Sequence, residues 1–527
     1  MTHQPVPGIE LSRRALLAGS AAALGGCDVS GIPADPRRLV MVVPQEISLL
    51  DPAVTLAVAD LGASQAAYQR LLAPVIENGM VTGITGDLAE SWTWAPDRSL
   101  LTIRLKPGQR FDDGIPVTAD AVRFSFERIV RQKMTASQAL FWLGGMETPD
   151  PLTVKMRIAV YLPFIEHMLW HPGLSIINPA VMAHAVDGDQ GSGWLRSNSA
   201  GSGSYRIAGF EPRASVTLKP NPHSANPPRF FQEIVLRTVR DVSSRSMQMA
   251  AGDADIVEFI TTIQARWLEQ KPKVRLVSGP SASIVFLHLN TENPVLKDVR
   301  VRRAIDLAIN REAIIRSIYR GEAEILHGLL PLGIPGSDAG IPRPRHDLGA
   351  ARTLLKEAGV PTGTPLTITA VTDSGAPSAT TLALREQLAE LGLAMSIREV
   401  STAARSQIVA GDFDMTSQSL SLDFPDPWIM FNFAFNSQSI GATNMSRYNN
   451  PELDALVARA DRSEPEERNR LYQQAQRKVL ADLPSIPLFR MNWTYAQGTD
   501  LAGGAYNFSS PQTHDFRAMY RIPKVDV

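Results

Sequence analysis

The sequence has only one cysteine, Cys27, among its 527 residues, so no disulfide can form within the chain. It also lacks an excess of either charge, because 52 basic residues balance 53 acidic ones to a formal net charge of -1. The absence of a basic patch argues against nucleic-acid binding. No stretch reaches about 18 uninterrupted apolar residues, so we expect a soluble mature chain, tethered at most by lipid.

Motifs of several enzyme classes are missing as well. The chain contains no G-x-S-x-G elbow, no P-loop, no glycine-rich dinucleotide fingerprint after a strand and no H-E-x-x-H. His167 and His171 could face a metal from one helix, but no third or fourth ligand is evident. The alternative is a histidine pair at a helix end, packed beside Trp170. We therefore expect no enzyme activity, no cofactor and no metal.

The N-terminus carries the features of an export signal. Arg13 and Arg14 precede a short, moderately apolar run, which resembles a twin-arginine (Tat) signal, although Sec export stays open. The segment Leu24-Gly25-Gly26-Cys27 resembles a lipobox, and Asp28 resembles an inner-membrane retention signal. We interpret residues 1–26 as a signal peptide and residues 27–37 as a tether. Lipidation of Cys27 would anchor a periplasmic protein to the outer face of the inner membrane; the alternative is a plain secretory signal with an incidental cysteine.

Apolar patterns along the mature chain predict strands that alternate with helices, which indicates an α/β fold. The expected strands are residues 39–43, 101–105, 234–239, 283–289, 366–371 and 415–422. The expected helix-capping residues are Thr118, Asp298, Asn310, Asp347, Asn450 and the pair Ser463 with Glu466.

One stretch indicates a ligand-binding site, residues 411–433. Prolines end its strand, and this leaves Asp423 and Asp426 at the carboxyl end, where ligands bind in open α/β sheets. Phe424 and Trp428 stand beside these carboxylates, a combination that suits a ligand with an amine. The alternative is an acidic turn that caps the following segment.

The order of motifs resembles a known family. Residues 88–125 read L-A-E-S-W-T-W-A-P-D-R-S-L-L-T-I-R-L-K-P-G-Q-R-F-D-D-G-I-P-V-T-A-D-A-V-R-F-S. Residues 201–206 read G-S-G-S-Y-R, and residues 298–305 read D-V-R-V-R-R-A-I. These segments resemble the extracellular solute-binding proteins of peptide and nickel ABC importers, family 5. The resemblance implies a periplasmic-binding-protein-like (class II) two-lobed clamp with an additional third lobe, built of mixed sheets flanked by helices.

The resemblance also implies how the chain divides and acts. The expected parts are lobe I (residues 38–75, 201–282 and 487–527), the extra lobe II (76–200) and lobe III (283–486). Asp423 stands where relatives pair an aspartate with the α-ammonium of the ligand, so Asp423, Phe424 and Trp428 are the expected ligand contacts. Gly201 and Gly203 are the expected hinge residues, together with segments 279–283 and 484–487.

The expected function is capture of a peptide or similar amine-bearing solute by a monomer that delivers it to an ABC permease and its ATPase. Nickel chelates, opines and sugar conjugates are alternative ligands within the family. A chemosensory or chaperone-like binder that feeds no permease stays open, as does an enzyme on this scaffold, against which the missing motifs argue.

Overall fold

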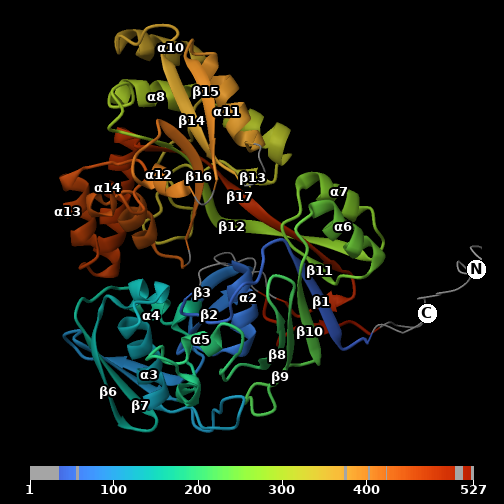
Figure 1. Ribbon diagram of the computed structural model, residues 1–527. Helices are drawn as coiled ribbons and strands as arrows, with labels where there is room; N and C mark the ends of the chain where they lie inside the picture. The colour runs from blue at the N-terminus through green and yellow to red at the C-terminus, as the bar shows by residue number, and fades with distance from the viewer. Residues whose placement is uncertain are drawn as a thin grey trace, which may run out of the picture.

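The computed structural model describes residues 35–54, 58–372, 377–401, 404–422, 424–504 and 514–523, and it shows a mixed α/β fold (Figure 1). A large mixed sheet extends through the described residues. Its strands are, in spatial order, β15 (Ala394–Val400), β14 (Pro365–Val371), β16 (Met415–Ser421), β12 (Val274–Leu289), β17 (Ser485–Gly498), β11 (Ile256–Val257), β1 (Arg38–Val43), β10 (Glu233–Thr238), β9 (Ser215–Pro220) and β8 (Tyr205–Glu211). The short strand β13 (Ala323–Glu324) pairs with β17 beside this path.

Two long strands join the two ends of this sheet. β12 and β17 pair antiparallel along most of their length and run between the end that holds β14 and β15 and the end that holds β1 and β10 (Figure 1). Their register shifts between Pro280 and Ile284, within the segment that we expected to cross between lobes I and III. Proline cannot donate a ladder hydrogen bond, which accounts for an irregularity at this point. The lobe boundaries themselves stay predictions.

The expected lobe II contains a separate antiparallel sheet. Its strands are, in spatial order, β4 (Ala89–Trp94), β5 (Leu100–Leu105), β7 (Thr153–Ile158) and β6 (Leu143–Asp150). Leu101, Ile103 and Leu105 are buried, as the alternation along this strand predicts. A hairpin of β2 (Leu72–Glu77) and β3 (Met80–Gly86) precedes this sheet, and the short pair β18 (Leu501–Ala502) and β19 (Tyr520–Arg521) lies near the other end of the chain.

Helices flank these sheets. They are α2 (Val58–Ala67), α3 (Ala119–Arg131), α4 (Ile165–Met168), α5 (Ser192–Leu195), α6 (Val242–Ala251), α7 (Thr262–Glu269), α8 (Val299–Ala308), α9 (Arg311–Ile314), α10 (Leu348–Glu357), α11 (Ala379–Ala389), α12 (Arg405–Val409), α13 (Pro451–Ala460) and α14 (Pro465–Asp482). Shorter 3-10 or π-helical turns are η1 (Thr135–Leu140), η2 (Pro172–Leu174), η3 (Pro179–His184), η4 (Ile315–Tyr319), η6 (Ile429–Phe433) and η7 (Ser437–Ser439). None of the helices in the described ranges has the length and apolarity of a membrane span.

Most of the predicted helix caps are confirmed. The side chains of Asp298, Asn310, Asp347 and Asn450 each accept a hydrogen bond from a backbone N–H of the first turn. Thr118 occupies the cap position of α3, but its side chain makes no capping bond.

The prediction of a capping box formed by Ser463 and Glu466 is wrong. Pro465 takes the first position of α14, which makes Glu464 the cap residue. The Ser463 hydroxyl instead donates to the carbonyl of Arg459, in the last turn of α13.

One buried apolar cluster spans all three expected lobes, because it also includes Leu71, Leu72 and Ala282 of the expected lobe I. It contains Trp142 and Phe164 of lobe II, and Phe431 and Tyr472 of lobe III, all fully buried. The expected lobes II and III therefore share a packed interior in this structure, and the predicted site stretch lies at their contact.

Candidate functional site

The predicted site stretch follows an interior strand of the large sheet. β16 pairs antiparallel with β12 and parallel with β14, and it ends at Ser421, close to the end that the prolines predict. The expected ligand anchor Asp423 lies outside the described residues, and so does the expected lipidation site Cys27. Their roles stay predictions.

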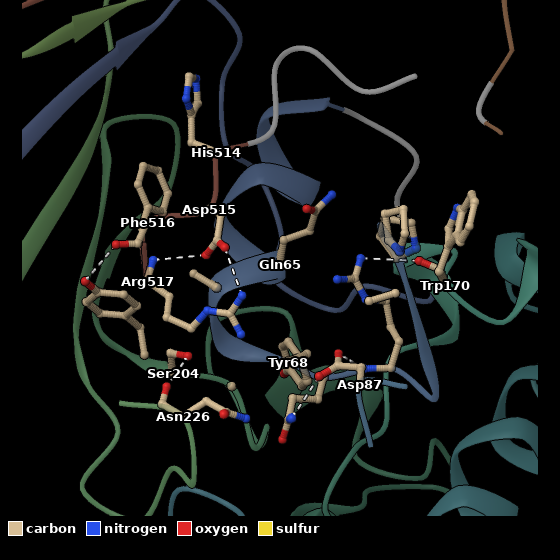
Figure 2. Close-up of a pocket in the computed structure, with 18 of the residues that line it drawn as sticks. Gln65, Tyr68, Asp87, Trp170, Ser204, Asn226, His514, Asp515, Phe516 and Arg517 are labelled. Carbon is tan, nitrogen blue, oxygen red and sulfur yellow. Dashed lines mark hydrogen bonds and ion pairs between the residues drawn. The ribbon is translucent and has the colours of Figure 1, made fainter. Parts of the chain in front are cut away.

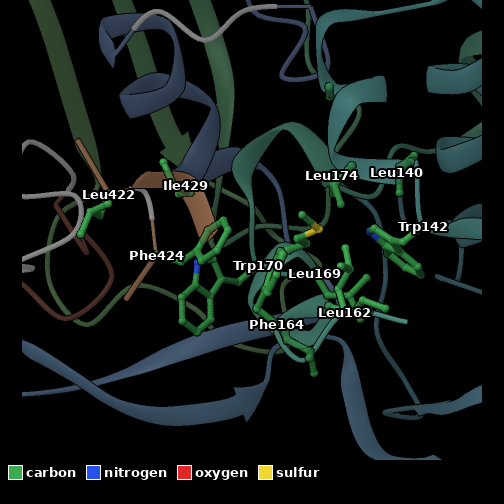
Figure 3. Close-up of a cluster of buried hydrophobic side chains, with 14 of the residues drawn as sticks. Leu140, Trp142, Leu162, Phe164, Leu169, Trp170, Leu174, Leu422, Phe424 and Ile429 are labelled. Carbon is green, nitrogen blue, oxygen red and sulfur yellow. The ribbon is translucent and has the colours of Figure 1, made fainter. Parts of the chain in front are cut away.

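The two expected aromatic ligand contacts pack against rings of the expected lobe II. The ring of Phe164 lies 5.5 Å from the ring of Phe424 and 5.0 Å from that of Trp428, and Phe141 stacks on Trp428 at 5.8 Å. Phe424 is only 6% exposed, whereas Trp428 is partly exposed. Figure 3 shows Phe424 among these buried side chains, with Phe164 and Trp170 of lobe II. These rings form a lobe contact of the kind that aromatic pairs stabilise.

Asp426, the second carboxylate of the stretch, is fully engaged. It forms a two-pronged ion pair with Arg468 of α14, with N–O distances of 2.8 and 2.7 Å. Its Oδ1 also accepts a hydrogen bond of 2.8 Å from the backbone N–H of Trp428. Asp426 and Arg468 are 4% and 5% exposed. The interpretation as an acidic turn that caps the following segment is therefore correct for Asp426.

The two histidines do not share a helix face. α4 ends at Met168, and His171 lies beyond it, where its Nδ1 accepts a 3.0 Å hydrogen bond from the N–H of Gly173. His167 packs on Trp170, with ring centres 4.8 Å apart. Burial lowers the pKa of both histidines, and burial together with the charge of Arg70 brings the pKa of His171 to about 4. The described residues hold no cluster of three or more candidate metal ligands.

A cavity of about 390 Å³ lies beside this lobe contact. It lies between α2, the β2–β3 hairpin, the loop around Asn226 and residues 514–517 (Figure 2). Trp170 lines the cavity and contacts His167, whose ring lies 6.0 Å from that of Phe424. The polar side chains that line it are Gln65, Tyr68, Gln69, Arg70, Asp87, Ser204, Tyr205, Ser224, Asn226, His514, Asp515 and Arg517.

The carboxylates of this cavity are already bonded. Asp87 accepts one hydrogen bond of 2.9 Å from the Gln69 amide and another of 2.9 Å from the backbone N–H of Arg70. Asp515 forms an ion pair of 2.9 Å with Arg517. Sequence reasoning missed these residues, because residues 65–87 and 514–517 are far apart in the chain and share no local motif.

The glycines expected at a hinge pack tightly against α2. A Cβ on Gly201 would lie 2.0 Å from the carbonyl oxygen of Ala67, and one on Gly203 would lie 2.3 Å from that of Ala66. The N–H of Gly203 donates to the carbonyl of Ala67 at 2.9 Å. The approach of the two backbones therefore requires glycine at both positions, whatever motion occurs there.

Similarity to solved structures defines the class of fold. The structure of DppA from Helicobacter pylori in complex with peptide STSA superposes with a TM-score of 0.80 at 22% identity, over 92% of this chain and 98% of that one. The fold is that of a class II periplasmic binding protein.

Sequence similarity then gives the family. A family model described as "Bacterial extracellular solute-binding proteins, family 5 Middle" matches residues 83–442 of this chain. The probable D,D-dipeptide-binding periplasmic protein DdpA of Escherichia coli K12 is 31% identical over 498 residues, which is 93% of this chain and 95% of that protein. The glutathione-binding protein GsiB of Pectobacterium atrosepticum is 27% identical over 79% of this chain and 82% of its own length. This chain belongs to the family 5 extracellular solute-binding proteins, and these relatives are binding proteins rather than enzymes.

Proposed function

We propose that this chain is the substrate-binding component of an ABC importer and captures a peptide or similar amine-bearing solute. The family match over residues 83–442 carries this proposal. The names of two relatives, for a D,D-dipeptide and for glutathione, support a short peptide as the ligand. The chain acts as a monomer and hands its solute unchanged to a permease and its ATPase.

The proposed site combines the expected anchor with the lobe contact. Asp423 pairs with the amine of the solute, just after β16. Trp428 keeps part of its surface exposed beside Phe141 and Phe164, so it can contact lobe II and the solute at once. Phe424 is nearly covered, so it mainly supports this arrangement. A solute held between lobes stabilises the closed state because it contacts both.

A panel of ligands tests the proposal. Binding of D-Ala-D-Ala, an L-dipeptide, glutathione and a nickel–histidine chelate is measured by calorimetry and thermal unfolding. We expect a dipeptide at 100 times its Kd to stabilise the protein by about 2.7 kcal/mol. The matched control is the same dipeptide with an acetylated amine, which should bind more weakly. Equal binding of both forms would argue against an amine anchor, and no binding of any peptide would refute the proposed ligand class.

We also propose periplasmic anchoring through Cys27 to the outer face of the inner membrane. The only cysteine follows Leu24-Gly25-Gly26, and the family is extracellular. Cys27→Ser should move the protein from the membrane fraction to the soluble periplasmic fraction. A membrane fraction that is unchanged by this substitution would refute lipidation.

We propose that the lobes move relative to one another at two places, the glycines Gly201 and Gly203 and the long strands β12 and β17. Gly201 and Gly203 lie where the chain leaves the expected lobe II, and the register shift after Pro280 lies where β12 joins lobes I and III. We place the opening motion at these points, because an irregular ladder resists bending less than a regular one.

A further inference from the structure

A second cavity, the arginine cavity, lies between α7 and the segment that runs from α9 through η4 to β13. Its volume of about 840 Å³ falls within the ~300–1,000 Å³ that small-molecule sites occupy. The acidic residues of its lining are Glu312 and Glu324. The arginines of its lining outnumber them and are Arg266 of α7, Arg316 of η4, Arg320 directly after η4, and Arg343.

Both glutamates of the arginine cavity already have a basic partner. Glu312 forms an ion pair of 3.4 Å with Arg343. Glu324 of β13 pairs with Arg490 of β17, which lies outside the lining. The negative charges of the lining are therefore engaged, and they balance only one of the four arginines that line it.

The three remaining arginines, Arg266, Arg316 and Arg320, have no counter-ion. Their side chains make no hydrogen bond or ion pair with any residue that the structure describes. All three are exposed, so water can solvate each of them. Like charges that line one cavity nevertheless repel one another, and this repulsion is relieved when an anion enters.

The arginine cavity and the predicted site stretch lie on opposite edges of the pair of long strands (Figure 1). β12 and β17 pair with each other. β16, which leads into the site stretch, pairs with β12, whereas β13, which lines the arginine cavity, pairs with β17. No residue lines both the arginine cavity and the cavity of Figure 2. The arginine cavity is therefore separate from both places where we expect the solute.

We propose that the arginine cavity is a second binding site and that it binds a phosphate group. A phosphate monoester carries a charge of about −1.5 to −2 and three acceptor oxygens. It therefore suits three guanidinium groups better than a carboxylate, which has one charge and two oxygens. Arg266 belongs to the expected lobe I and the other two arginines to the expected lobe III, so one bound phosphate would link the two lobes.

Two sources of this phosphate are a free phosphate ester and the headgroup of a phospholipid. The lipid has its own support on α7, where Ile263 and Trp267 are one helical turn apart and 67% and 38% exposed. Exposed apolar and aromatic side chains beside arginines are typical of elements that lie on a membrane surface. The test therefore needs one probe for each source.

Glycerol phosphate is the free probe, measured by calorimetry, with uncharged glycerol as its control. The lipid probe is phosphatidylcholine vesicles with and without phosphatidylglycerol, measured by co-sedimentation. Only binding that depends on phosphatidylglycerol counts, because the lipid anchor proposed at Cys27 would act on both kinds of vesicle. We expect the wild-type protein to bind at least one phosphate probe and to ignore the matched control.

Variants then assign this binding to the arginine cavity. Arg316→Gln combined with Arg320→Gln should weaken it at least about tenfold, and Arg266→Gln, on the other element, should weaken it in the same direction. Arg462→Gln makes the same change of charge at an exposed arginine outside the cavity and should leave binding unchanged. Substitutions of exposed side chains usually have little effect on stability, so these proteins should fold.

Binding of glycerol phosphate that is lost in the cavity variants would identify a free ester as the ligand. Vesicle binding that requires phosphatidylglycerol and is lost in the same variants would identify a lipid headgroup. Absence of binding of both probes would overturn the proposal, and so would binding that survives in the variants or falls equally in Arg462→Gln. Because Arg266 lies on a different element from the other two arginines, either variant decides if the other does not fold. None of these outcomes depends on which solute the protein captures.

Discussion

The lobe contact and the cavity are neighbours, yet they differ in how their charges are satisfied. At the contact, Asp426 and Arg468 are buried and bonded to each other through two hydrogen bonds. In the cavity, Arg70 makes one hydrogen bond of 3.3 Å to the carbonyl of Trp170 and no ion pair with any described residue. Nε is buried without a partner among the described residues in both arginines, so the two sites differ in the counter-ion. A buried charge that is paired with its counter-ion supports the fold, whereas one without a counter-ion remains available to other partners. Thus a carboxylate beside aromatic residues is not by itself evidence of a ligand site.

The largest effect should come from breaking the satisfied pair. Asp426→Ala leaves Arg468 buried without its counter-ion, so the free energy of unfolding should fall by about 3–5 kcal/mol. Urea denaturation measures this change. The control is Glu467→Gln, which breaks the exposed ion pair with Arg470 and should have little effect. Equal, small losses in both variants would show that this buried ion pair within the expected lobe III does not stabilise the fold.

The next effect tests whether the same stretch also binds the solute. Asp423→Asn keeps the size of the side chain but removes its charge, so affinity for an amine-bearing dipeptide should fall by about 1.5–3 kcal/mol. Calorimetry measures the loss, and the N-acetylated dipeptide should lose nothing further. Unchanged affinity would move the amine anchor elsewhere and make residues 423–428 purely structural.

Local patterns made the elements around the site predictable. The strand that ends at Ser421 and the caps Asp298, Asn310 and Asn450 depend on residues within one or two turns, which the sequence displays directly. The two wrong predictions, the capping box and the histidine pair, arose where a helix begins or ends at a different residue than expected. Pro465 displaced the predicted cap, and the end of α4 after Met168 separated His167 from His171.

The cavity could not be predicted, because it depends on contacts between distant segments. Arg70 and Asp515 are brought together only by the fold, and nothing near Arg70 in the sequence shows that it lacks an ion-pair partner among the described residues. Likewise, the role of Phe424 and Trp428 as ligand contacts stays a prediction, and only the structure shows that Phe164 contacts both rings. The type of a residue indicates which interactions its side chain can make. Which of these interactions are formed within the protein can be seen only in the three-dimensional structure.

A smaller effect is expected from His171, which lies beside Arg70 and should make the stability of the protein depend on pH. The pKa of His171 is about 4 in the folded state and about 6.5 when unfolded, so the unfolded chain binds the proton first as the pH falls. Stability from this group is complete above about pH 6.5 and is lost as the pH falls toward 4. His171→Gln should reduce the loss of stability between pH 7 and 5 by about 1–2 kcal/mol.

Urea denaturation at a series of pH values checks this result. Part of the slope should persist in the variant, because burial also lowers the pKa of His288, to about 4. Superimposable pH profiles of wild type and variant would mean that His171 is not held neutral beside Arg70.

The smallest effect measures the ring contact between the lobes. Phe141 and Trp428 stack with their planes 15° apart, and such a pair contributes about 0.5–1.5 kcal/mol beyond the area it buries. A double-mutant cycle with Phe141→Leu and Trp428→Leu should recover a coupling of this size in the free energy of unfolding. If Trp428 also contacts the solute, the coupling should change when a dipeptide is bound, because the two lobes and the ligand then share one ring. A coupling near zero in both states would mean that the stacking of these two rings does not stabilise the contact between the expected lobes II and III.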